Sequence, residues 1–377
     1  MEIVAWFGLA CAILFALAAA VLSAAIFRLP RSKPAFGDSL PHVSVLITCR
    51  NEERDIARCL SSLAALDYPA EKLQVVAVDD RSTDSTAEII ADFCATRPNW
   101  MFARSSAASK LPGKARGIAE AARHATGEWL FITDADAAVP AGWIRGMLAP
   151  ATPDTGVIGG TYDVIADSFT GVLERVTSIT CLGFVTGAVG LGGAAVPLGP
   201  SMAIRRDVYE AAGGLEAADF KVAEDIALWR MSEAAGRSAV LCAEPSGCVT
   251  VVPVPSFAHM ISQQRRWIAG GFGDGPAFLR PMVVMMALFA LLGASASYVA
   301  AAALDPRGIA AVACIAGAML LLLIAMRWRL RISGLLRLAP LGIPYMLTVL
   351  IWLPLSSFLY RRISWRGTGY ADAYQRS

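Results

Sequence analysis

The chain has 377 residues, and 56% of them are hydrophobic. Its mean hydropathy of +0.53 is too high for an ordinary soluble enzyme. The net charge of +2 gives no reason to expect a nucleic-acid partner. Eight cysteines lie scattered without CxxC spacing or an accompanying histidine cluster, which argues against a zinc site.

The hydrophobic residues collect near the two ends of the chain. Four apolar runs are long enough to cross a bilayer, at residues 3–27, 281–304, 309–326 and 338–360. The segment between the first two runs has the mixed composition of a globular domain. We predict a transmembrane anchor at 1–30, a globular domain at 40–270, a membrane region with two or three spans at 276–362 and a basic tail at 363–377.

Basic residues beside the apolar runs predict the orientation. The first run is too long for a signal peptide and lacks a basic leader, so we expect an anchor. Arg28, Arg31 and Lys33 follow it and place the globular domain in the cytoplasm, as do arginines within 327–337. Prolines in 338–360 leave room for a re-entrant segment, so the side of the C-terminus stays open. Arginine outnumbers lysine as in GC-rich bacteria, and we expect a multi-pass protein of a bacterial inner membrane.

Strand and helix patterns alternate from residue 42 onward. Residues 42–48 predict a buried strand, and Asn51 is expected to cap the helix that follows it. A second strand at 73–78 precedes an acidic turn, after which Ser85 and Glu88 fit a capping box. Three further patterns follow: a strand at 100–104, a helix at 115–124 and a strand that ends at 134. This alternation predicts an α/β fold with a doubly wound parallel sheet.

Polar residues follow the strands, and the carboxyl ends of parallel strands meet at one crevice. Asp134 and Asp136 are two positions apart, so both side chains could face one hard cation, although Asp is also common in turns. Lys114 or Arg116 could meet phosphate charge. Neither a Walker motif nor a GxGxxG after the first strand is present, which argues against a dinucleotide enzyme. The set suits a nucleotide diphosphate with a divalent metal, and its predicted nucleotide-binding members are Thr48, Arg50, Glu52, Asp79, Asp80, Lys114 and Asp134.

Four motifs together resemble the family 2 glycosyltransferases over residues 42–270. They are the opening strand and turn at 43–52, Val-Asp-Asp-Arg-Ser-Thr-Asp at 78–84, Gly-Lys-Ala-Arg at 113–116 and Asp-Ala-Asp at 134–136. The resemblance implies the GT-A fold, a Rossmann-like and mostly parallel sheet with flanking helices, joined here to transmembrane helices. It also implies inverting transfer from a nucleotide-sugar donor, with Mg²⁺ or Mn²⁺ held by Asp134 and Asp136.

Two later motifs bear on catalysis. Glu224 and Asp225 open a predicted helix at 226–235, where acidic residues also favour the helix dipole. Transfer needs a general base, and the resemblance implies Asp225 for that role with Glu224 beside it. Three further residues match the Gln-x-x-Arg-Trp motif of membrane-bound members, although the same stretch fits a basic juxtamembrane helix. The resemblance adds them to the donor site: Gln263, Arg266 and Trp267.

The apolar, glycine-rich segment 172–199 precedes the expected acceptor region. It fits either a core segment with a flexible loop or a surface that dips into the membrane interface. Residues 201–215, the motifs above and the tail at 363–370 narrow the resemblance to ceramide glucosyltransferase and its bacterial relatives. That resemblance implies transfer of one hexose, first of all from UDP-glucose, to a ceramide-like lipid hydroxyl in the bilayer. The acceptor region is predicted at Gly199, Ser201 and Trp267.

Three alternatives remain open. A processive polysaccharide synthase shares the Gln-x-x-Arg-Trp motif, but few predicted spans leave little protein to wall a polymer channel. A non-catalytic nucleotide-sugar-binding membrane protein would not need every acidic position that is filled here. A transporter would need more spans and more charge inside them.

Overall fold

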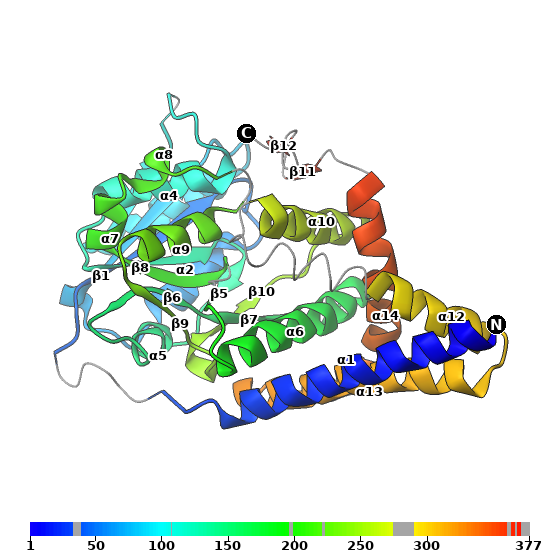
Figure 1. The fold of residues 1–377 in the computed structure, drawn as a ribbon. Coiled ribbons are helices and arrows are strands. Elements are labelled where there is room, and N and C mark those ends of the chain that lie inside the picture. Colours follow the sequence, from blue (N-terminus) through cyan, green and yellow to red (C-terminus); the bar gives the residue numbers. More distant parts are fainter. Residues whose placement is uncertain are drawn as a thin grey trace.

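The computed structural model describes residues 1–32, 39–106, 108–195, 199–220, 223–273, 290–359, 363–365 and 368–370. In Figure 1 an α/β domain stands at one end of the molecule and a bundle of long helices extends from it. Helix α10 (Phe257–Gly273) lies between these two parts.

The α/β domain is built on a seven-stranded sheet in the order β3-β2-β1-β4-β8-β6-β9. All its neighbouring strands are parallel except β8, which runs antiparallel to both β4 and β6. The expected α/β fold is therefore confirmed, with one reversed strand that the alternating pattern did not predict. The strands are β1 (Val43–Cys49), β2 (Leu73–Asp79), β3 (Trp100–Arg104), β4 (Trp129–Asp134), β6 (Thr155–Gly159), β8 (Ser201–Arg205) and β9 (Ser238–Leu241).

Helices cover both faces of this sheet. The side chains on both faces of the central strands are therefore buried, and most of them are apolar. Val45 and Ile47 of β1 pack with α2, α3 and α5, whereas Leu46 points to the other face and packs with α4, α7, α8 and α9. The covering helices are α2 (Ile56–Ala64), α3 (Thr86–Ala95), α4 (Gly113–His124), α5 (Trp143–Leu148), α7 (Arg206–Ala211), α8 (Gly214–Ala217) and α9 (Glu224–Ala234). Short 3₁₀ turns, η1 (Ala70–Lys72) and η2 (Pro245–Gly247), precede β2 and β10.

A small three-stranded sheet links the domain to α10. Its order is β5 (Ala137–Ala138), β10 (Cys248–Val251) and β7 (Thr161–Val164). Strand β5 follows Asp136 directly, and the N–H of Val252 donates to the Asp136 carbonyl at 3.2 Å. The chain then runs from β10 into α10, so one strand connects the Asp-x-Asp turn with the helix that carries the Gln-x-x-Arg-Trp motif.

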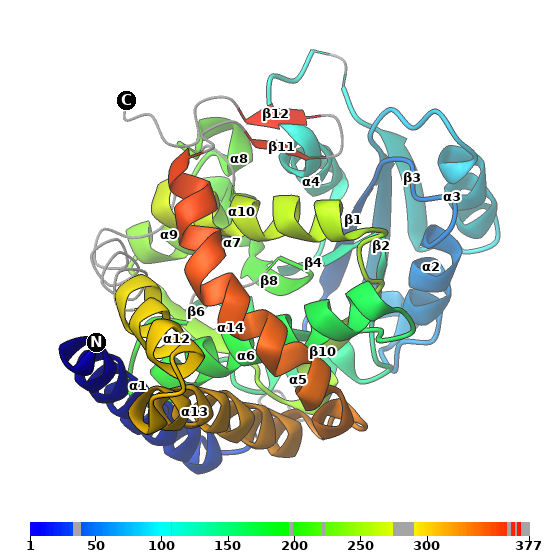
Figure 2. The same ribbon diagram turned by 90° about the vertical axis from the view of Figure 1, so that its right-hand side faces the viewer.

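The helix bundle has its own apolar core. Its members are α1 (Glu2–Arg28), α6 (Phe169–Gly190), the π-helical turn η3 (Ala290–Ala294), α12 (Ser295–Ala302), α13 (Pro306–Leu330) and α14 (Leu335–Leu359). Helices α1 and α13 lie side by side, and Figure 2 shows α14 crossing α6 with α10 packed beside it. A short hairpin of β11 (Ile363–Trp365) and β12 (Thr368–Tyr370) lies against α10.

Among the described residues, three helices are long and apolar enough to cross a membrane: α1, α6 and α13. Of the two readings of 172–199, the core segment followed by a loop is the one that the structure shows, because residues up to Gly190 form α6 and several of them lie in the bundle core. Its glycines and threonines suit a helix whose neighbours approach closely. The predicted run at 281–304 lies partly outside the described residues, and the run at 338–360 falls in α14 with its described apolar stretch at 335–349.

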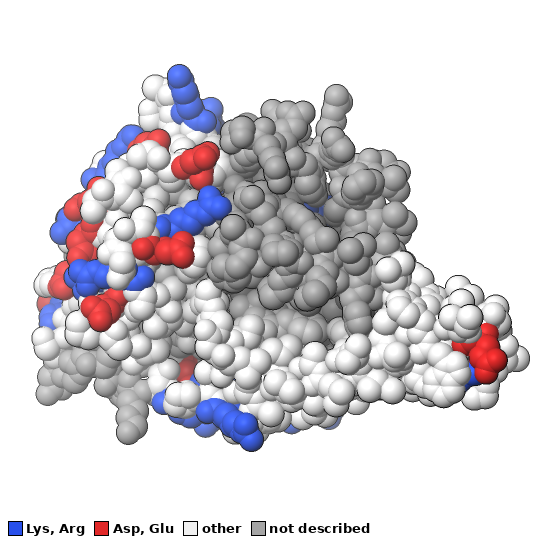
Figure 3. Space-filling view, in the orientation of Figure 1, with Lys and Arg blue, Asp and Glu red and all other residues white. Residues whose placement is uncertain are grey.

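The surfaces of the two parts differ in chemistry. Charged side chains gather over the α/β domain in Figure 3, while the described surface of the bundle is mostly uncharged. Helix α1 exposes large hydrophobic side chains such as Trp6, Leu14 and Leu17 along its outer face. A water-soluble protein rarely exposes such a continuous apolar face, so this face suits lipid.

Two predicted helix caps are wrong in detail. Asn51 lies five residues before α2 begins, in a left-handed turn with φ of +54°. Its side chain accepts the N–H of Thr83 at 2.8 Å and does not cap α2. The expected box between Ser85 and Glu88 does not form, because Asp84 accepts the N–H of Thr86 at 3.1 Å instead. At Asn51 a contact with the loop after β2 replaces the expected cap, whereas at α3 the neighbouring Asp84 takes the place of Ser85.

Candidate functional site

The ends of β1, β2 and β4 meet in one place. Thr48 lies opposite Asp134 in the β1–β4 register, and Cys49 lies opposite Asp79 in the β1–β2 register. Helix α4 packs directly against this edge, because a Cβ atom at Gly117 would lie 2.1 Å from Thr48 Cγ2. Only glycine permits this approach, and it brings the first turn of α4 over the end of β4.

Lys114, in the first turn of α4, joins the two predicted acidic motifs. Its Nζ lies 2.5 Å from Oδ1 of Asp134 and 3.3 Å from Oε1 of Glu224, and it donates to the carbonyl of Gly199 at 3.3 Å. Burial lowers the pKa of Lys114, but the charges of Asp134 and Glu224 outweigh it and raise the pKa overall. The amine is therefore a fixed cation between the end of β4 and the start of α9.

Asp225 lies on the other side of Gly199. Its Oδ2 accepts the Gly199 N–H at 3.2 Å, and its Oδ1 accepts the N–H of Ile226 at 2.8 Å. Burial and the charge of Glu224 raise the pKa of Asp225 to about 6, against the opposing effect of Lys114 and Arg266. A carboxylate with such a pKa is mostly ionised at neutral pH and is a better proton acceptor than an ordinary aspartate.

Asp134 and Asp136 fit a divalent cation. Burial and the charge of Asp134 raise the pKa of Asp136 to about 7, against the opposing charge of Lys114. Two carboxylates that resist simultaneous ionisation are stabilised by a shared cation. The described part of the chain contains no group of three or more potential metal-ligating side chains. The donor set therefore suits Mg²⁺ or Mn²⁺ completed by substrate oxygens, since Mg²⁺ commonly binds one or two carboxylates together with phosphates.

The loops after β1 and β2 hold one another beside these carboxylates. The N–H of Asn51 donates to Ser82 Oγ at 3.0 Å, and the N–H of Glu52 donates to Thr86 Oγ1 at 2.8 Å. Asp79 is buried and accepts the Ser82 N–H at 3.3 Å. Arg50, between the two strands, is half-buried. Arg50, Glu52 and Asp79 thus lie on or beside one pair of interlocked loops.

Asp80 and Arg116 form a bidentate ion pair at 2.7 and 2.9 Å, and Ser105 Oγ also donates to Asp80 at 2.5 Å. Burial raises the pKa of Asp80, but these hydrogen bonds outweigh it and hold the pKa below the usual range. The idea that Arg116 meets phosphate is therefore not supported, since its guanidinium is engaged. Both oxygens of Asp80 are engaged too, so the pair fixes α4 on the sheet.

Helix α10 carries the Gln-x-x-Arg-Trp motif. The positive charge of Arg266 lowers the pKa values of both Asp225 and Tyr162, so it acts electrostatically on the predicted base. Gln263 hydrogen-bonds Glu174 of α6. Trp267 is half-buried one residue further on. The group formed by Asp134, Lys114, Gly199 and Asp225 is called the crevice below. Gln263 and Arg266 therefore connect the crevice with the helix bundle.

Glu174 is a site residue that the sequence reasoning missed. It is buried on α6, and besides Gln263 it accepts the N–H of Val254 at 2.9 Å, at the approach to α10. The signal that could have found it is a carboxylate in a mostly apolar segment, because such a charge needs a specific partner.

The assignment of Ser201 to the acceptor region is not supported. Its hydroxyl is fully buried, accepts from Trp143 Nε1 at 3.0 Å and donates to the carbonyl of Gly247 at 3.0 Å. The side chain therefore holds β8 to α5 and η2. Gly199, two residues earlier, does lie in the crevice between Lys114 and Asp225.

A GT-A sheet whose strand ends carry an Asp-x-Asp turn defines a nucleotide-sugar-dependent transferase fold. A mannosyltransferase of Pyrobaculum calidifontis, solved with GDP-mannose and Mn²⁺, has the same fold with a TM-score of 0.59, 20% identity and coverage of 94% of this chain and 99% of that one. Glycosyl transferase family 21 matches residues 7–375, and the chain belongs to this family. The resemblance drawn from the motifs is thereby confirmed.

Curated relatives match shorter stretches. A beta-monoglucosyldiacylglycerol synthase of Nostoc is 34% identical over 115 residues, which is 30% of this chain and 24% of that protein. The glycosyltransferase AglE of Haloferax volcanii is 27% identical over 144 residues, 38% of this chain and 46% of that protein. The chain thus spans a quarter to a half of the length of these relatives, which agree with the family without fixing a substrate.

Proposed function

We propose that this protein is a metal-dependent inverting glycosyltransferase that moves one hexose from a nucleotide sugar, first of all UDP-glucose, to the hydroxyl of a membrane lipid. The observation that carries the proposal is the set of contacts around Lys114. Its amine pairs with Asp134, in the proposed metal-binding turn, and with Glu224, and Gly199 links it to the proposed base Asp225. Donor activation and proton transfer therefore share one crevice.

In the proposed reaction the chain's own groups have separate tasks. A divalent cation held by Asp134 and Asp136 would neutralise the diphosphate. The loops after β1 and β2, with Arg50, Glu52 and Asp79, hold the nucleotide. Asp225 accepts the proton of the lipid hydroxyl while that oxygen bonds to the sugar C1 and the bond from C1 to the diphosphate breaks. Arg266, whose charge acts on Asp225, offsets charge on the departing nucleoside diphosphate.

The bundle supports a lipid acceptor and a cytoplasmic crevice. Helices α1 and α13 run in the same direction, since Glu2 pairs with Arg307 at 3.1 Å at their beginnings and Leu29 meets Arg329 at their ends. Both basic ends therefore lie on the side of the α/β domain, which the positive-inside rule assigns to the cytoplasm of a bacterial inner membrane. The multi-pass arrangement and the domain bounds at 40–270 belong to this proposal.

The experiment that tests the proposal is mass spectrometry of membrane lipids from cells with and without the gene product. We expect a new lipid carrying one hexose, with either a diacylglycerol or a ceramide-like backbone. A purified assay with UDP-glucose, Mn²⁺ and vesicles that contain each lipid would then identify the acceptor. A polymeric product would favour a processive synthase, and release of no product from any nucleotide sugar would favour the non-catalytic alternative.

A further inference from the structure

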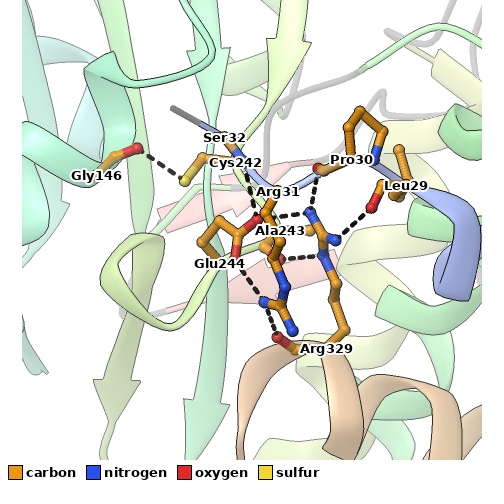
Figure 4. A network of polar contacts seen from close by, with 9 residues as sticks. All are labelled: Leu29, Pro30, Arg31, Ser32, Gly146, Cys242, Ala243, Glu244 and Arg329. Atoms are coloured by element: carbon orange, nitrogen blue, oxygen red, sulfur yellow. Dashed lines mark hydrogen bonds and ion pairs between the residues drawn. The ribbon is translucent and has the colours of Figure 1, made fainter. Parts of the chain in front are cut away.

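An ion network with a buried Glu244–Arg329 pair joins the α/β domain to the two long helices (Figure 4). Glu244, between β9 and β10, binds Arg31 through Oε2 at 2.5 Å and Arg329 through Oε1 at 2.7 Å. Arg31 follows α1 and Arg329 is near the end of α13, so one carboxylate joins three parts of the chain.

The network is closed by backbone carbonyls. Arg329 donates to Ala243 at 2.7 Å, to Leu29 at 2.7 Å and to Pro30 at 3.0 Å, and Arg31 donates to the carbonyl of Arg329 at 2.9 Å. Arg329 is 2% exposed and Glu244 is 9% exposed. Such a satisfied buried pair differs from a surface salt bridge, because loss of one partner leaves an unpaired charge in the interior.

Glu244 lies on the segment that carries the site. Four residues after it begins β10, which pairs with β5 next to Asp136. The N–H of Val252, the residue after β10, donates to the Asp136 carbonyl at 3.2 Å. The same strand continues into α10 with Arg266. A shift of Glu244 relative to the helices would therefore move the metal end and the motif helix together.

We propose that the Arg31–Glu244–Arg329 network is a positioning device that sets the height of the crevice relative to the bilayer, so that a hydroxyl of a membrane-embedded lipid reaches Asp225. This inference rests on the proposed function. In this role the three residues help a lipid acceptor in the bilayer to reach the crevice, although they are not among the proposed sugar- or metal-binding residues.

The role predicts a difference between acceptors. A network that only stabilises the fold affects every acceptor equally. A network that sets height affects a long-chain lipid fixed in a bilayer more than a short-chain analogue that diffuses to the crevice. The measured quantity is the ratio of kcat/KM for long-chain ceramide in phosphatidylcholine vesicles to kcat/KM for hexanoylceramide in detergent, with a diacylglycerol pair if that is the acceptor class.

The variants are Glu244→Gln and Arg31→Ala in the full-length protein. We expect the ratio to fall about tenfold or more, within the range that a misplacement of about 1 Å brings, while the KM for UDP-glucose stays the same. Glu216→Gln is the matched control, because Glu216 pairs with Arg123 at 2.7 Å on the exposed domain surface and should leave the ratio unchanged. An unchanged ratio in both network variants would overturn the inference.

A measurement that does not depend on activity completes the test. If Glu244→Gln fails to fold, Arg31→Ala keeps the test open, because the Arg31 side chain is 39% exposed. Hydrogen exchange should rise in residues 245–264 of a folded variant and stay the same in β1 and β4; no rise would count against the inference. Wild-type protein without transfer to either acceptor would refute the proposed function itself, whereas active wild type with unaffected variants refutes only the positioning role.

Discussion

The α/β domain and the helix bundle bury charged groups in different ways. In the crevice, Lys114 pairs with both Asp134 and Glu224, and the nearby Asp136 and Asp225 have raised pKa values. At the junction with the bundle, Glu244 lies between two arginines, and both of these also donate to backbone carbonyls. The crevice therefore keeps capacity for an added cation and a proton, whereas the junction is complete in itself.

A second ion pair at the junction with the bundle is also completed by a backbone carbonyl. Arg175 of α6 binds Asp163 of β7 bidentately at 2.7 and 2.6 Å and also donates to the carbonyl of Ser333 at 3.2 Å. Substitutions in the crevice should therefore lower the rate and leave folding intact. Substitutions in the bundle should lower stability and leave the chemistry intact.

Asp225→Asn should give the largest loss. The amide keeps the shape of the side chain but cannot accept the hydroxyl proton, so we expect kcat to fall by about 10²- to 10⁴-fold. Binding of UDP-glucose, measured by calorimetry, should stay the same. The thermal unfolding midpoint should also stay near that of the wild type.

Glu233→Gln provides the control for this variant. Glu233 lies in the same helix, α9, but is exposed at its far end. It should keep full activity. Full activity in Asp225→Asn as well would show that the raised pKa of Asp225 has no catalytic meaning, and the contrast between crevice and junction would fail.

The dependence of rate on pH should follow Asp225. Its pKa is raised to about 6, so the carboxylate gains a proton as the pH falls through that value. Since the base must be unprotonated, kcat/KM for the acceptor should fall by up to about tenfold per pH unit below this point. Lys114 lowers the pKa of Asp225, so Lys114→Met should move the acidic limb to higher pH. A profile that stays flat to about pH 5 would exclude Asp225 as the base.

The sequence predicted the crevice better than its surroundings. Asp134 and Asp136 follow the end of a parallel strand, where a ligand site is expected. Lys114 and Asp225 lie in the first turns of α4 and α9, which the sequence patterns also indicated. Contacts distant in sequence were not predictable in this way. The pairing of Asp80 with Arg116 and the burial of Ser201 depend on how α4 and β8 pack, which no local pattern contains.

The bundle was least predictable at α6. Its threonines donate to carbonyls one turn earlier, as Thr177 does to Leu173 at 2.8 Å, so they fit an apolar helix despite their polarity. The mean hydropathy of α6 is lower than that of α1 and α13, although it is high enough for a membrane span. The neighbouring helices, which cover much of its surface, make it part of the bundle.

Glu174 tests the boundary between the two regions. Glu174→Ala leaves the buried N–H of Val254 without its acceptor, so we expect a loss of about 1–3 kcal/mol in stability and a lower kcat as α10 shifts. Glu174→Gln keeps an acceptor oxygen and should restore most of both. Thermal unfolding in detergent and the transfer assay measure the two effects. If Ala and Gln behave alike, Glu174 does not position α10.

The smallest effect should come from the bundle itself. A Cβ at Gly342 of α14 would lie 2.4 Å from Val176 of α6, so Gly342→Ala should cost about 1–3 kcal/mol by overpacking. Gly317→Ala in α13 is the matched control, because no atom lies within 4 Å of its Cβ and alanine favours a helix. The unfolding midpoint should fall for the first and hold or rise for the second, while kcat at low temperature stays the same in both. A loss of kcat without a loss of stability in Gly342→Ala would mean that bundle packing acts on the chemistry, because α14 also contacts α10.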